Sequence, residues 1–358
     1  MYKFAFIIHP LDVQDVARKF PLARRLPPGW VEKALLFLPP VKVSHITDIR
    51  SPYSQTEGWF VACPLTTRQF LHLPEELVID RIIRAGRLAE RLGAHILGLG
   101  AMTAVVGDGG RTVAQNLSIA VTTGNSYTVA TAIEATERAA QVMEIDLKQA
   151  KIAIIGATGS IGSVCARILA KTYPHLVLAA RSRDKLERLA EQIKKESPAV
   201  PEFTTQVKEA VKEAPVIITV TSAEEPLIEP EDLLPGAVVC DVARPRDVSR
   251  LVAQKRDDVL VIDGGVVEVP GEVDFHFNFG YPKGLAYACM AETMILALEG
   301  RIENFSLGKE LTVEQVEAIK KMAEKHGFRV AGFRSFELPL SSAQVEAIKA
   351  RAKRKKAV

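Results

Sequence analysis

A glycine-rich turn near the middle of the chain has the residue spacing that binds a dinucleotide. Residues 156–162 read GATGSIG, after an apolar run at 152–155 and before a helical run at 163–171. In such turns the first glycine makes the bend, the second lets backbone N–H groups approach a pyrophosphate, and the third lets helix and strand pack closely. The helix N-terminus adds a positive dipole end that favours phosphate. The residues expected to contact a cofactor here are Gly156, Ala157, Thr158, Gly159, Ser160, Ile161 and Gly162.

The residues after the second strand of this βαβ unit indicate which dinucleotide binds. The strand expected at 176–179 is followed by Ala180-Arg181-Ser182-Arg183, without an acidic residue. An acidic residue roughly 20 positions after the turn would bind the 2′-hydroxyl of NAD, whereas arginines suit a 2′-phosphate. The sequence therefore predicts NADPH as the cofactor, contacted by Arg181, Ser182 and Arg183.

One cysteine is placed where a thiol could act as a nucleophile. Cys289 lies near the start of a helix expected at 285–300. Unpaired N–H groups and the dipole at a helix N-terminus lower the pKa of a thiol and favour the thiolate. Most free cysteines are nevertheless packing residues. Cys165 and Cys240 lie inside an expected helix and an expected strand, which leaves Cys63, at a strand end, as the only rival.

The elements after the glycine turn predict a doubly wound parallel sheet. Three runs, at 216–221, 237–242 and 259–263, are short, apolar and continuous, as in parallel strands that are covered on both faces. Ligands of such sheets lie beyond the carboxyl ends of the strands. The cofactor neighbours nominated on this ground are Ser222, Ala243, Asp263, Gly264 and Gly265. Each of the two glycines, taken alone, could equally be a strand-ending turn.

The remaining residues mix strands and helices. The first hundred residues are punctuated by prolines, and their secondary structure is irregular. Strand-like runs lie at 4–8, 41–49, 58–62 and 118–121. Helical spacing of apolar residues occurs at 75–92, 129–143, 312–326 and 342–355.

The predicted fold class is therefore α/β. Residues 1–146 are expected to form an N-terminal α+β substrate domain, and residues 147–280 a doubly wound parallel Rossmann domain. Residues 281–358 are expected to form a segment that carries the nucleophile and whose C-terminal helices pack back on the domains.

Composition is that of a globular protein with two domains. The chain has 358 residues, of which 47% are hydrophobic and 25% charged. The formal charge of +3 is too small to imply binding of nucleic acid. The last ten residues are nevertheless strongly basic, which indicates either a solvated helix end or a docking site for an acidic partner. No apolar run reaches the length of a bilayer span, so no transmembrane segment is expected. No leader pattern is visible either, so a cytoplasmic location is expected. The four cysteines lack metal-type spacing, so no metal site is expected.

Several motifs together resemble the cyanobacterial long-chain acyl-(acyl-carrier-protein) reductases. The similarity is nearly end to end, weaker before Leu97 and absent after about Arg329. The motifs that carry it are GATGSIGS, VIDGGVVE (261–268), AYACMAE (286–292), NFSLG (304–308), HGF (326–328), TTGNSYT (122–128) and IDLKQA before the first Rossmann strand.

The resemblance implies an activity and the roles of several residues. That family uses NADPH to convert acyl carrier protein thioesters into fatty aldehydes through a cysteine in the A-C-x-A-E motif, which corresponds to Cys289. Its glycine turn corresponds to Gly156, Gly159 and Gly162, and its phosphate-binding arginine to Arg181. An aldehyde-consuming enzyme is a possible partner. Residues 241–247, DVARPRD, instead look like shikimate dehydrogenases and glutamyl-tRNA reductases, which leaves acyl length and the carrier, acyl carrier protein or coenzyme A, open.

The chemistry expected of these residues is covalent capture of an acyl group. The Cys289 thiolate would attack a thioester carbonyl, and the enzyme-bound thioester would accept hydride from NADPH. Oxyanion donors could come from Thr123, Asn125, Tyr127 and Thr128, although these residues could equally cap a helix. His276 could supply a proton, although a packed or surface role is more common for a lone histidine. An apolar channel could be lined by residues 97–106 and 285–298.

Two other functions remain open at this point. A shikimate-type NADP alcohol dehydrogenase acting on a small polar substrate would use a lysine–aspartate pair. Lys33 and Lys42 have no obvious acidic partner, and Asp108 lies in a glycine loop. A protein that binds NADPH without catalysis would require the Cys289 region to be packing alone.

Overall fold

The computed structural model describes residues 1–356, which form two compact units, each built from separate stretches of the chain. The first unit comprises Met1–Asn125, Glu268–Glu310 and Ala318–Arg329. The second comprises Ser126–Val267, Leu311–Glu317 and the described residues from Val330 onward. This division differs from the three consecutive domains expected from the sequence, because the residues beyond 280 are shared between the two units.

The first unit is built on a six-stranded sheet with the strand order β13-β2-β3-β1-β4-β5. Its strands are β1 Lys3–Ile8, β2 Val41–Arg50, β3 Gln55–Ala62, β4 Ile96–Gly98, β5 Ala120–Thr122 and β13 Gly271–Asp274. β1 pairs in parallel with β3 and β4, and β4 with β5, whereas β2 and β13 join one edge antiparallel. The region that looked irregular in sequence is thus an ordered, largely parallel sheet.

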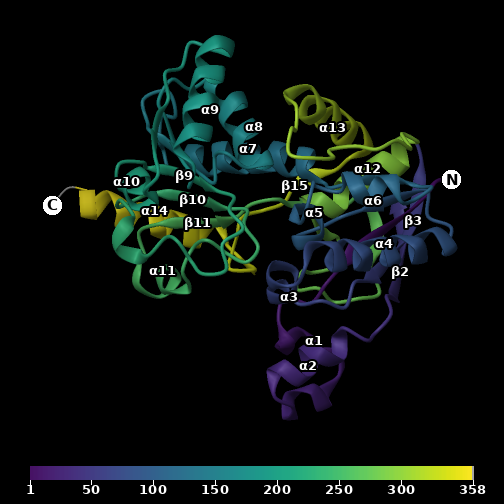
Figure 1. The fold of residues 1–358 in the computed structure, drawn as a ribbon. Helices are drawn as coiled ribbons and strands as arrows, with labels where there is room; N and C mark the ends of the chain where they lie inside the picture. Colours follow the sequence, from purple (N-terminus) through teal and green to yellow (C-terminus); the bar gives the residue numbers. More distant parts are fainter. Residues whose placement is uncertain (357–358) are drawn as a thin grey trace. The chain divides into compact units, whose positions relative to one another are not determined.

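Two long helices pack on this sheet (Figure 1). Ala5 and Ile7 of β1 belong to the core cluster that also contains Ile82 of α4 (Glu75–Arg91). Gly98 at the end of β4 lies against α12 (Ala288–Glu299), where a Cβ would come within 2.1 Å of Thr293 Oγ1. Because successive side chains of a strand point to opposite faces, the sheet presents one face to α4 and the other to α12.

A helical insertion separates β1 from β2. We define it as residues 11–39; it contains α1 (Val13–Lys19), η1 (Pro21–Arg25) and α2 (Pro28–Leu35). It is the purple group of short helices in Figure 1. The other elements of the first unit are α3 Thr67–His72, α5 Met102–Val105, α6 Arg111–Gln115 and β14 Leu285–Tyr287.

The second unit contains the predicted doubly wound sheet. Its six strands are parallel and lie in the order β11-β10-β9-β6-β7-β8, which is the 3-2-1-4-5-6 order of Rossmann folds. The strands are β6 Ile152–Ile155, β7 Leu176–Ala179, β8 Glu202–Thr204, β9 Val216–Thr219, β10 Val238–Asp241 and β11 Leu260–Asp263. The helices are α7 Asn125–Val142, α8 Ser160–Ala170, α9 Arg183–Glu196, α10 Val207–Lys212, η2 Pro230–Asp232 and α11 Arg250–Lys255. The predicted α/β class with a Rossmann sheet is confirmed.

The C-terminal residues add helices and short strands. These elements are β12 Val266–Glu268, α13 Val313–His326, β15 Arg329–Val330, β16 Arg334–Ser335, β17 Leu338–Pro339 and α14 Ser342–Lys356. α14 packs on the second unit through buried Val345 and Ala352. Its cations pair with acids of the same unit, since Lys349 and Lys353 contact Glu144 and Lys355 contacts Asp258 at 2.9 Å. The basic end of the chain therefore holds α14 in place.

Membrane crossing by a helix is not supported in residues 1–356. None of the helices in this range combines the length and the apolar character that such a crossing needs.

Candidate active site

Cys289 lies in the first turn of α12. The helix begins at Ala288 and not at residue 285 as expected, because Leu285–Tyr287 form the strand β14. Tyr287 is the N-cap residue, so Cys289 is the second residue of the helix and is partly exposed. The first turn of a helix is, in general, a position where the helix dipole favours a thiolate over a thiol.

The other three thiols are unsuited to nucleophilic attack. Cys63, Cys165 and Cys240 are fully buried. Burial raises the pKa of Cys63 to about 12 and that of Cys240 to about 12. Burial also raises the pKa of Cys165 far above its usual range. Cys63, the rival candidate from sequence, is therefore a core residue, and Cys289 is the partly exposed cysteine among the four.

Thiol labelling should reflect this difference. We expect iodoacetamide at neutral pH to modify Cys289 of the folded protein and to leave the other three thiols unmodified, because these are protonated and sealed from solvent. Peptide mass spectrometry measures the labelling of each site, and the unfolded protein, in which all four should react, is the control. Labelling of Cys63 in the folded protein at a rate similar to Cys289 would contradict the assignment.

A glycine of the TTGNSYT turn presses on the nucleophile candidate. Gly124 follows β5 and has φ +76°. A Cβ at this position would lie 2.3 Å from Cys289 Cα and 2.4 Å from Cys289 Cβ. Both the backbone conformation and the close approach therefore require glycine. Thr123 and Asn125, on either side of Gly124, were candidate donors from the sequence, but nothing in the spacing of the motif indicates that Gly124 contacts Cys289.

A buried carboxyl group ties α12 to the end of β5. Glu292, one turn after Cys289, is fully buried and accepts hydrogen bonds from Thr122 Oγ1 at 2.5 Å and Ser306 Oγ at 2.8 Å. Thr123 Oγ1 donates to the backbone carbonyl of Ser306 at 2.6 Å. The hydroxyl of Thr123, nominated as an oxyanion donor, is thus engaged in holding the 304–306 segment. Glu292 and Ser306 lie within AYACMAE and NFSLG, and nothing in the sequence of these motifs indicates that the two side chains meet.

This carboxyl network should contribute to stability. Thr122→Val removes a hydroxyl that donates to Glu292, and we expect it to lower the free energy of unfolding by about 2–3 kcal/mol, because a fully buried carboxyl group loses a hydrogen-bond donor that water cannot replace. Thr56→Val is the matched control: its hydroxyl donates to the backbone carbonyl of Tyr2, a residue exposed to solvent, so about 1 kcal/mol is expected. Urea unfolding measures both. Equal losses in the two variants would contradict the proposed importance of Glu292.

The other nominated donors have different surroundings. Asn125 was also considered as a cap of the helix expected at 129–143, but α7 begins at Asn125, so this residue lies in its first turn. Asn125 is half-buried, whereas Tyr127 and Thr128 are buried. Tyr127 lies on the second unit's side of the division of the chain. Asn125 therefore remains the most accessible of the nominated side chains.

An aromatic pocket is formed by residues 274–283, which precede Cys289 in the sequence. It has a volume of about 260 Å³ and is lined by Asp274, Phe275, His276, Phe277, Asn278, Phe279, Tyr281, Pro282 and Lys283. Tyr281 packs edge-on against Tyr287, the N-cap of α12, with ring centroids 4.9 Å apart. His276 is exposed, and its Nδ1 lies 2.8 Å from the carbonyl of His45.

The channel expected along residues 97–106 is not formed by the large apolar side chains of this segment. Leu97, Leu99 and Met102 belong to the hydrophobic core.

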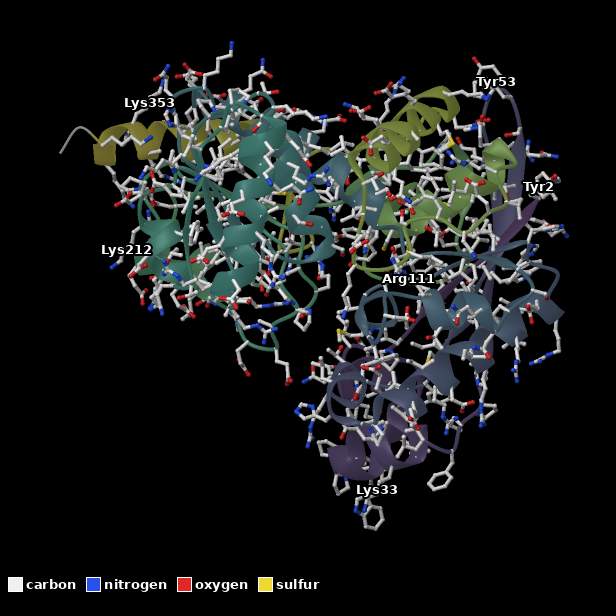
Figure 2. The ribbon with its side chains drawn as sticks, turned by 45° about the horizontal axis from the view of Figure 1, so that its top comes forward. Tyr2, Lys33, Tyr53, Arg111, Lys212 and Lys353 are labelled. Atoms are coloured by element: carbon white, nitrogen blue, oxygen red, sulfur yellow. The ribbon has the colours of Figure 1, made fainter. Side chains whose placement is uncertain are left out.

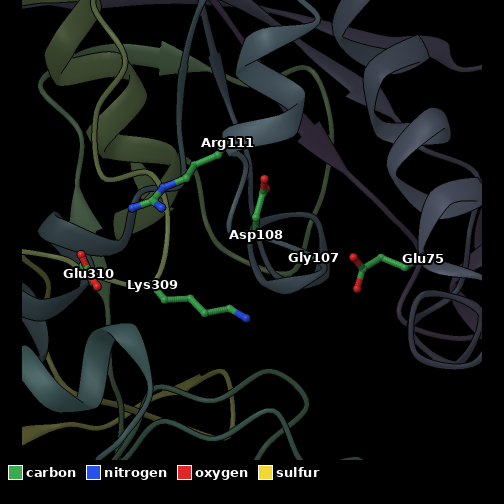
Figure 3. Close-up of a pocket in the computed structure, with 6 residues that line it drawn as sticks. All are labelled: Glu75, Gly107, Asp108, Arg111, Lys309 and Glu310. Carbon is green, nitrogen blue, oxygen red and sulfur yellow. The ribbon is translucent and has the colours of Figure 1, made fainter.

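A second pocket of the first unit is lined by charged residues (Figure 3). It has a volume of about 450 Å³ and is lined by Glu75, Gly107, Asp108, Arg111, Lys309 and Glu310. Lys309 extends into the open space that Glu75 faces from the other side. Asp108 accepts a hydrogen bond from Thr112 Oγ1 at 2.7 Å. The pocket lining therefore includes a lysine and an aspartate, although the Asp108 carboxylate is bonded to Thr112 and points away from Lys309 in Figure 3.

The glycine turn of the second unit has the geometry that a dinucleotide requires. Gly156 has φ +83°, and its carbonyl accepts a hydrogen bond from the N–H of Gly159 at 3.0 Å. A Cβ on Gly162 would lie 2.4 Å from the carbonyl oxygen of Gly156, so helix and strand approach as closely as the spacing predicted. α8 begins at Ser160, immediately after the turn, and not at residue 163. Its N-terminal amides fit a pyrophosphate.

The two nominated arginines differ in their surroundings. Arg181 is exposed just after β7 and forms no ion pair within residues 1–356. Arg183 is the first residue of α9, where Nε contacts Glu187 at 2.9 Å and the guanidinium lies over Phe203. Ser182 is the N-cap residue of α9. The guanidinium of Arg183 is therefore engaged by its neighbours, whereas Arg181 is exposed to solvent.

The carboxyl ends of β9, β10 and β11 carry a network of charges. Asp263 is buried, and although burial raises its pKa, the hydrogen bond and charge of Arg246 outweigh this and lower it. Burial raises the pKa of Asp241 to about 6. Ser222 is exposed after β9, whereas Ala243 is buried.

The two glycines after β11 have separate structural roles. A Cβ on Gly264 would lie 2.6 Å from Val242 Cγ2, so glycine is needed here for packing. Gly265 has φ +71° and makes a turn. These packing and turn roles account for both glycines without a ligand.

The chain is similar to a protein family and to several known proteins. Residues 137–263, which contain all six strands of the second sheet, match the family described as shikimate / quinate 5-dehydrogenase. The chain is 32% identical over 351 residues to aminotransferase PigE of a Serratia species, covering 93% of this chain and 40% of that protein. It is 29% identical over 320 residues to the long-chain acyl-[acyl-carrier-protein] reductase of Synechococcus elongatus, covering 81% and 87%. It is 31% identical over 231 residues to glutamyl-tRNA reductase of Haloquadratum walsbyi, covering 63% and 47%.

These similarities indicate the general class of oxidoreductase to which residues 137–263 are related. The sheet order, the glycine turn and the family match place residues 137–263 with Rossmann dehydrogenase-like oxidoreductases that use NAD or NADP. The chain spans less than half the length of the Serratia relative, so the name of that protein does not assign an aminotransferase reaction here.

Proposed function

We propose that the chain reduces a long-chain fatty acyl thioester, carried by acyl carrier protein or coenzyme A, to the fatty aldehyde with NADPH. The observation that carries the proposal is the position of Cys289: partly exposed, second in α12, and held against Gly124. The likeness to the Synechococcus reductase over 81% of the chain supports the substrate class.

The proposed reaction begins with exchange of one thioester for another. The Cys289 thiolate attacks the acyl carbonyl, a C–S bond forms to the enzyme, and the C–S bond to the carrier breaks as the carrier thiolate leaves. N-terminal amides of α12 and the side chain of Asn125 are the groups that would stabilise the oxyanion. The hydrogen bonds that buried Glu292 accepts from Thr122 and Ser306 would hold α12 against the end of β5 during this step.

Reduction then releases the product. NADPH bound at the glycine turn would supply the hydride for the acyl carbon. Hydride addition would leave a thiohemiacetal oxyanion on Cys289, whose collapse breaks the C–S bond, frees the aldehyde and regenerates the Cys289 thiolate. The carrier thiolate released in the first step takes up one proton, from solvent or from His276. The aromatic pocket next to Tyr287 offers apolar surface for part of the acyl chain. The sum consumes one acyl thioester, one NADPH and one proton.

Product analysis tests the proposal. Purified protein is incubated with palmitoyl-acyl carrier protein, or with palmitoyl-coenzyme A, and NADPH, and aldehyde is measured by gas chromatography together with NADPH consumption. Equal amounts of aldehyde and oxidised cofactor are expected. No aldehyde from either thioester, with the protein folded and binding NADPH, would reject it.

Cofactor preference should depend on Arg181. Arg181→Gln is expected to raise the KM for NADPH about tenfold or more and to leave the KM for NADH nearly unchanged, because a charged hydrogen bond to the 2′-phosphate is lost. Arg183→Gln is the matched control, since Arg183 is already paired with Glu187 and a smaller change is expected. Steady-state kinetics measures both. A larger effect from Arg183→Gln would reverse the assignment.

A shikimate-type NADP dehydrogenase of a small polar substrate is the second candidate. The family match over residues 137–263 and the charged pocket with Lys309 and Asp108 favour it. Such an enzyme would lose ketone reduction in Lys309→Met and keep it in Cys289→Ala. The thioester reductase should show the opposite pattern, so these two variants separate the candidates.

A further inference from the structure

The helical insertion, residues 11–39, carries its largest apolar side chains on the outside. Its small core cluster consists of Val16, Ala17, Ala23, Val31 and Leu35. Outside it are Phe20, Leu22, Leu26, Trp30, Phe37 and Leu38, with Trp30 69% and Phe37 86% exposed. Large apolar side chains that are exposed together on one short segment mark a site of interaction. The insertion is therefore a candidate docking surface.

Cations are interleaved with these side chains. Lys33 is exposed and follows Trp30 at the i+3 spacing of α2, so the two side chains share a face. Phe37 is exposed just after the end of this helix. Arg24 and Arg25 are exposed in η1. Figure 2 shows Lys33 projecting from the outer end of the insertion.

The acidic residues of the insertion have local roles. The Asp12 carboxylate caps α1 by accepting from the N–H of Asp15 at 3.0 Å, and the Asp15 carboxylate accepts from the N–H of Leu11 at 2.9 Å. Glu32 accepts from Thr66 Oγ1 at 3.1 Å, on the inner side of α2. The charge on the outer face is therefore positive.

The orientation of the insertion is fixed by its inner side. Gln69 Nε2 of α3 donates to the carbonyl of Glu32 at 2.9 Å, and Arg81 Nη1 of α4 donates to the carbonyl of Leu38 at 3.1 Å. Because these bonds hold α2 from the side of Glu32, Trp30 cannot turn inward without breaking them. The exposed face is a stable feature of the first unit.

We propose that the outer face of the helical insertion docks on an anionic lipid bilayer. Trp, Phe and Leu side chains flanked by Lys and Arg are the composition that places a short helix at the boundary of headgroups and acyl chains. An acidic protein would be recognised by the cations, but it would not require so many aromatic and leucine side chains on one small insertion. This inference is independent of the proposed reaction, although a bilayer would also accept a long-chain product.

Vesicle binding tests the proposal without substrate or cofactor. The full chain is mixed with vesicles of phosphatidylcholine, or of phosphatidylcholine with phosphatidylglycerol, and sedimented. Binding is expected to the anionic vesicles, and to weaken with salt. Trp59 is buried, so a blue shift of tryptophan emission on binding is assigned to Trp30. Trp30→Ser with Phe37→Ser should lower partitioning at least tenfold.

Charge variants and controls complete the test. Arg24→Gln, Arg25→Gln and Lys33→Gln together should lower partitioning about a hundredfold. Val200→Ser and Lys212→Gln, at exposed positions of the second unit, should leave it unchanged. Absence of binding to anionic vesicles, or binding that is unaffected in the insertion variants, overturns the proposal. Cross-linking of the insertion to acyl carrier protein in the absence of vesicle binding overturns it in favour of a protein partner. Insertion variants that lose vesicle binding but still form aldehyde would leave the proposed function standing.

Discussion

Cys289→Ala is expected to lower the rate of aldehyde formation by about 10³-fold or more, because no other thiol can replace the nucleophile that carries the acyl group. Cys63, Cys165 and Cys240 are sealed in the core, and burial raises their pKa values. Steady-state NADPH oxidation with acyl thioester measures the loss. NADPH binding, followed by fluorescence titration, should be unchanged, because the glycine turn belongs to the second unit.

Cys63→Ala is the matched control for this variant. It removes a thiol of the same unit, and it should cost stability through a cavity but should keep kcat within a few-fold of the wild type. A Cys289→Ala protein with full activity, or a Cys63→Ala protein that is folded but inactive, would contradict the assignment of the nucleophile.

Gly124→Ala is expected to reduce kcat about a hundredfold and to lower the free energy of unfolding by about 3 kcal/mol. The added Cβ would lie 2.3 Å from Cys289 Cα, so either the turn or the start of α12 must move. Overpacking of this kind and a left-handed φ of a residue other than glycine both carry a cost. The displacement falls on the nucleophile itself, so activity should suffer beyond the loss of stability.

Gly93→Ala separates backbone strain from the clash. Gly93 has φ +87°, close to that of Gly124, but its added Cβ would meet nothing within 4 Å. Its cost should be about 1 kcal/mol, with kcat unchanged. Urea unfolding and kinetics on the two variants measure the difference. Equal effects of the two substitutions on kcat would show that contact between Gly124 and Cys289 is unimportant.

Most of the Rossmann sheet could be predicted from local sequence, because β6, β7, β9, β10 and β11 are short, continuous apolar runs. β8, Glu202–Thr204, was missed because it is short and not apolar. Residues 152–155 and 176–179 are strands with the expected bounds. The first unit was harder to predict, because β1 pairs with β3 and β4, which are distant in sequence and separated by prolines and an insertion. Such pairings leave no periodic pattern. The apolar run at 285–287 was assigned to a helix for a related reason, since a short run does not distinguish helix from strand.

The sequence nominates the thiol of the candidate site but not the residues that hold this thiol in place. Cys289 could be nominated from the sequence because it follows a proline and a glycine at the start of an apolar run. The contact of Gly124 with Cys289, and the bonds of Glu292 to Thr122 and Ser306, join residues far apart in the chain. Spacing within a motif does not reveal such contacts. The hydroxyl of Thr123 was nominated as a donor, although the structure shows it bonded to a backbone carbonyl.

The central claim is that Cys289 carries the acyl group, and acyl transfer without reduction tests it most directly. The protein is incubated with palmitoyl-acyl carrier protein or palmitoyl-coenzyme A in the absence of NADPH, digested at low pH and analysed by mass spectrometry. The account predicts a palmitoyl thioester on the peptide that contains Cys289, none on the peptides of the other three cysteines, and release of the acyl group as aldehyde once NADPH is added. Finding no adduct on Cys289, together with undiminished aldehyde formation by Cys289→Ala, would contradict it.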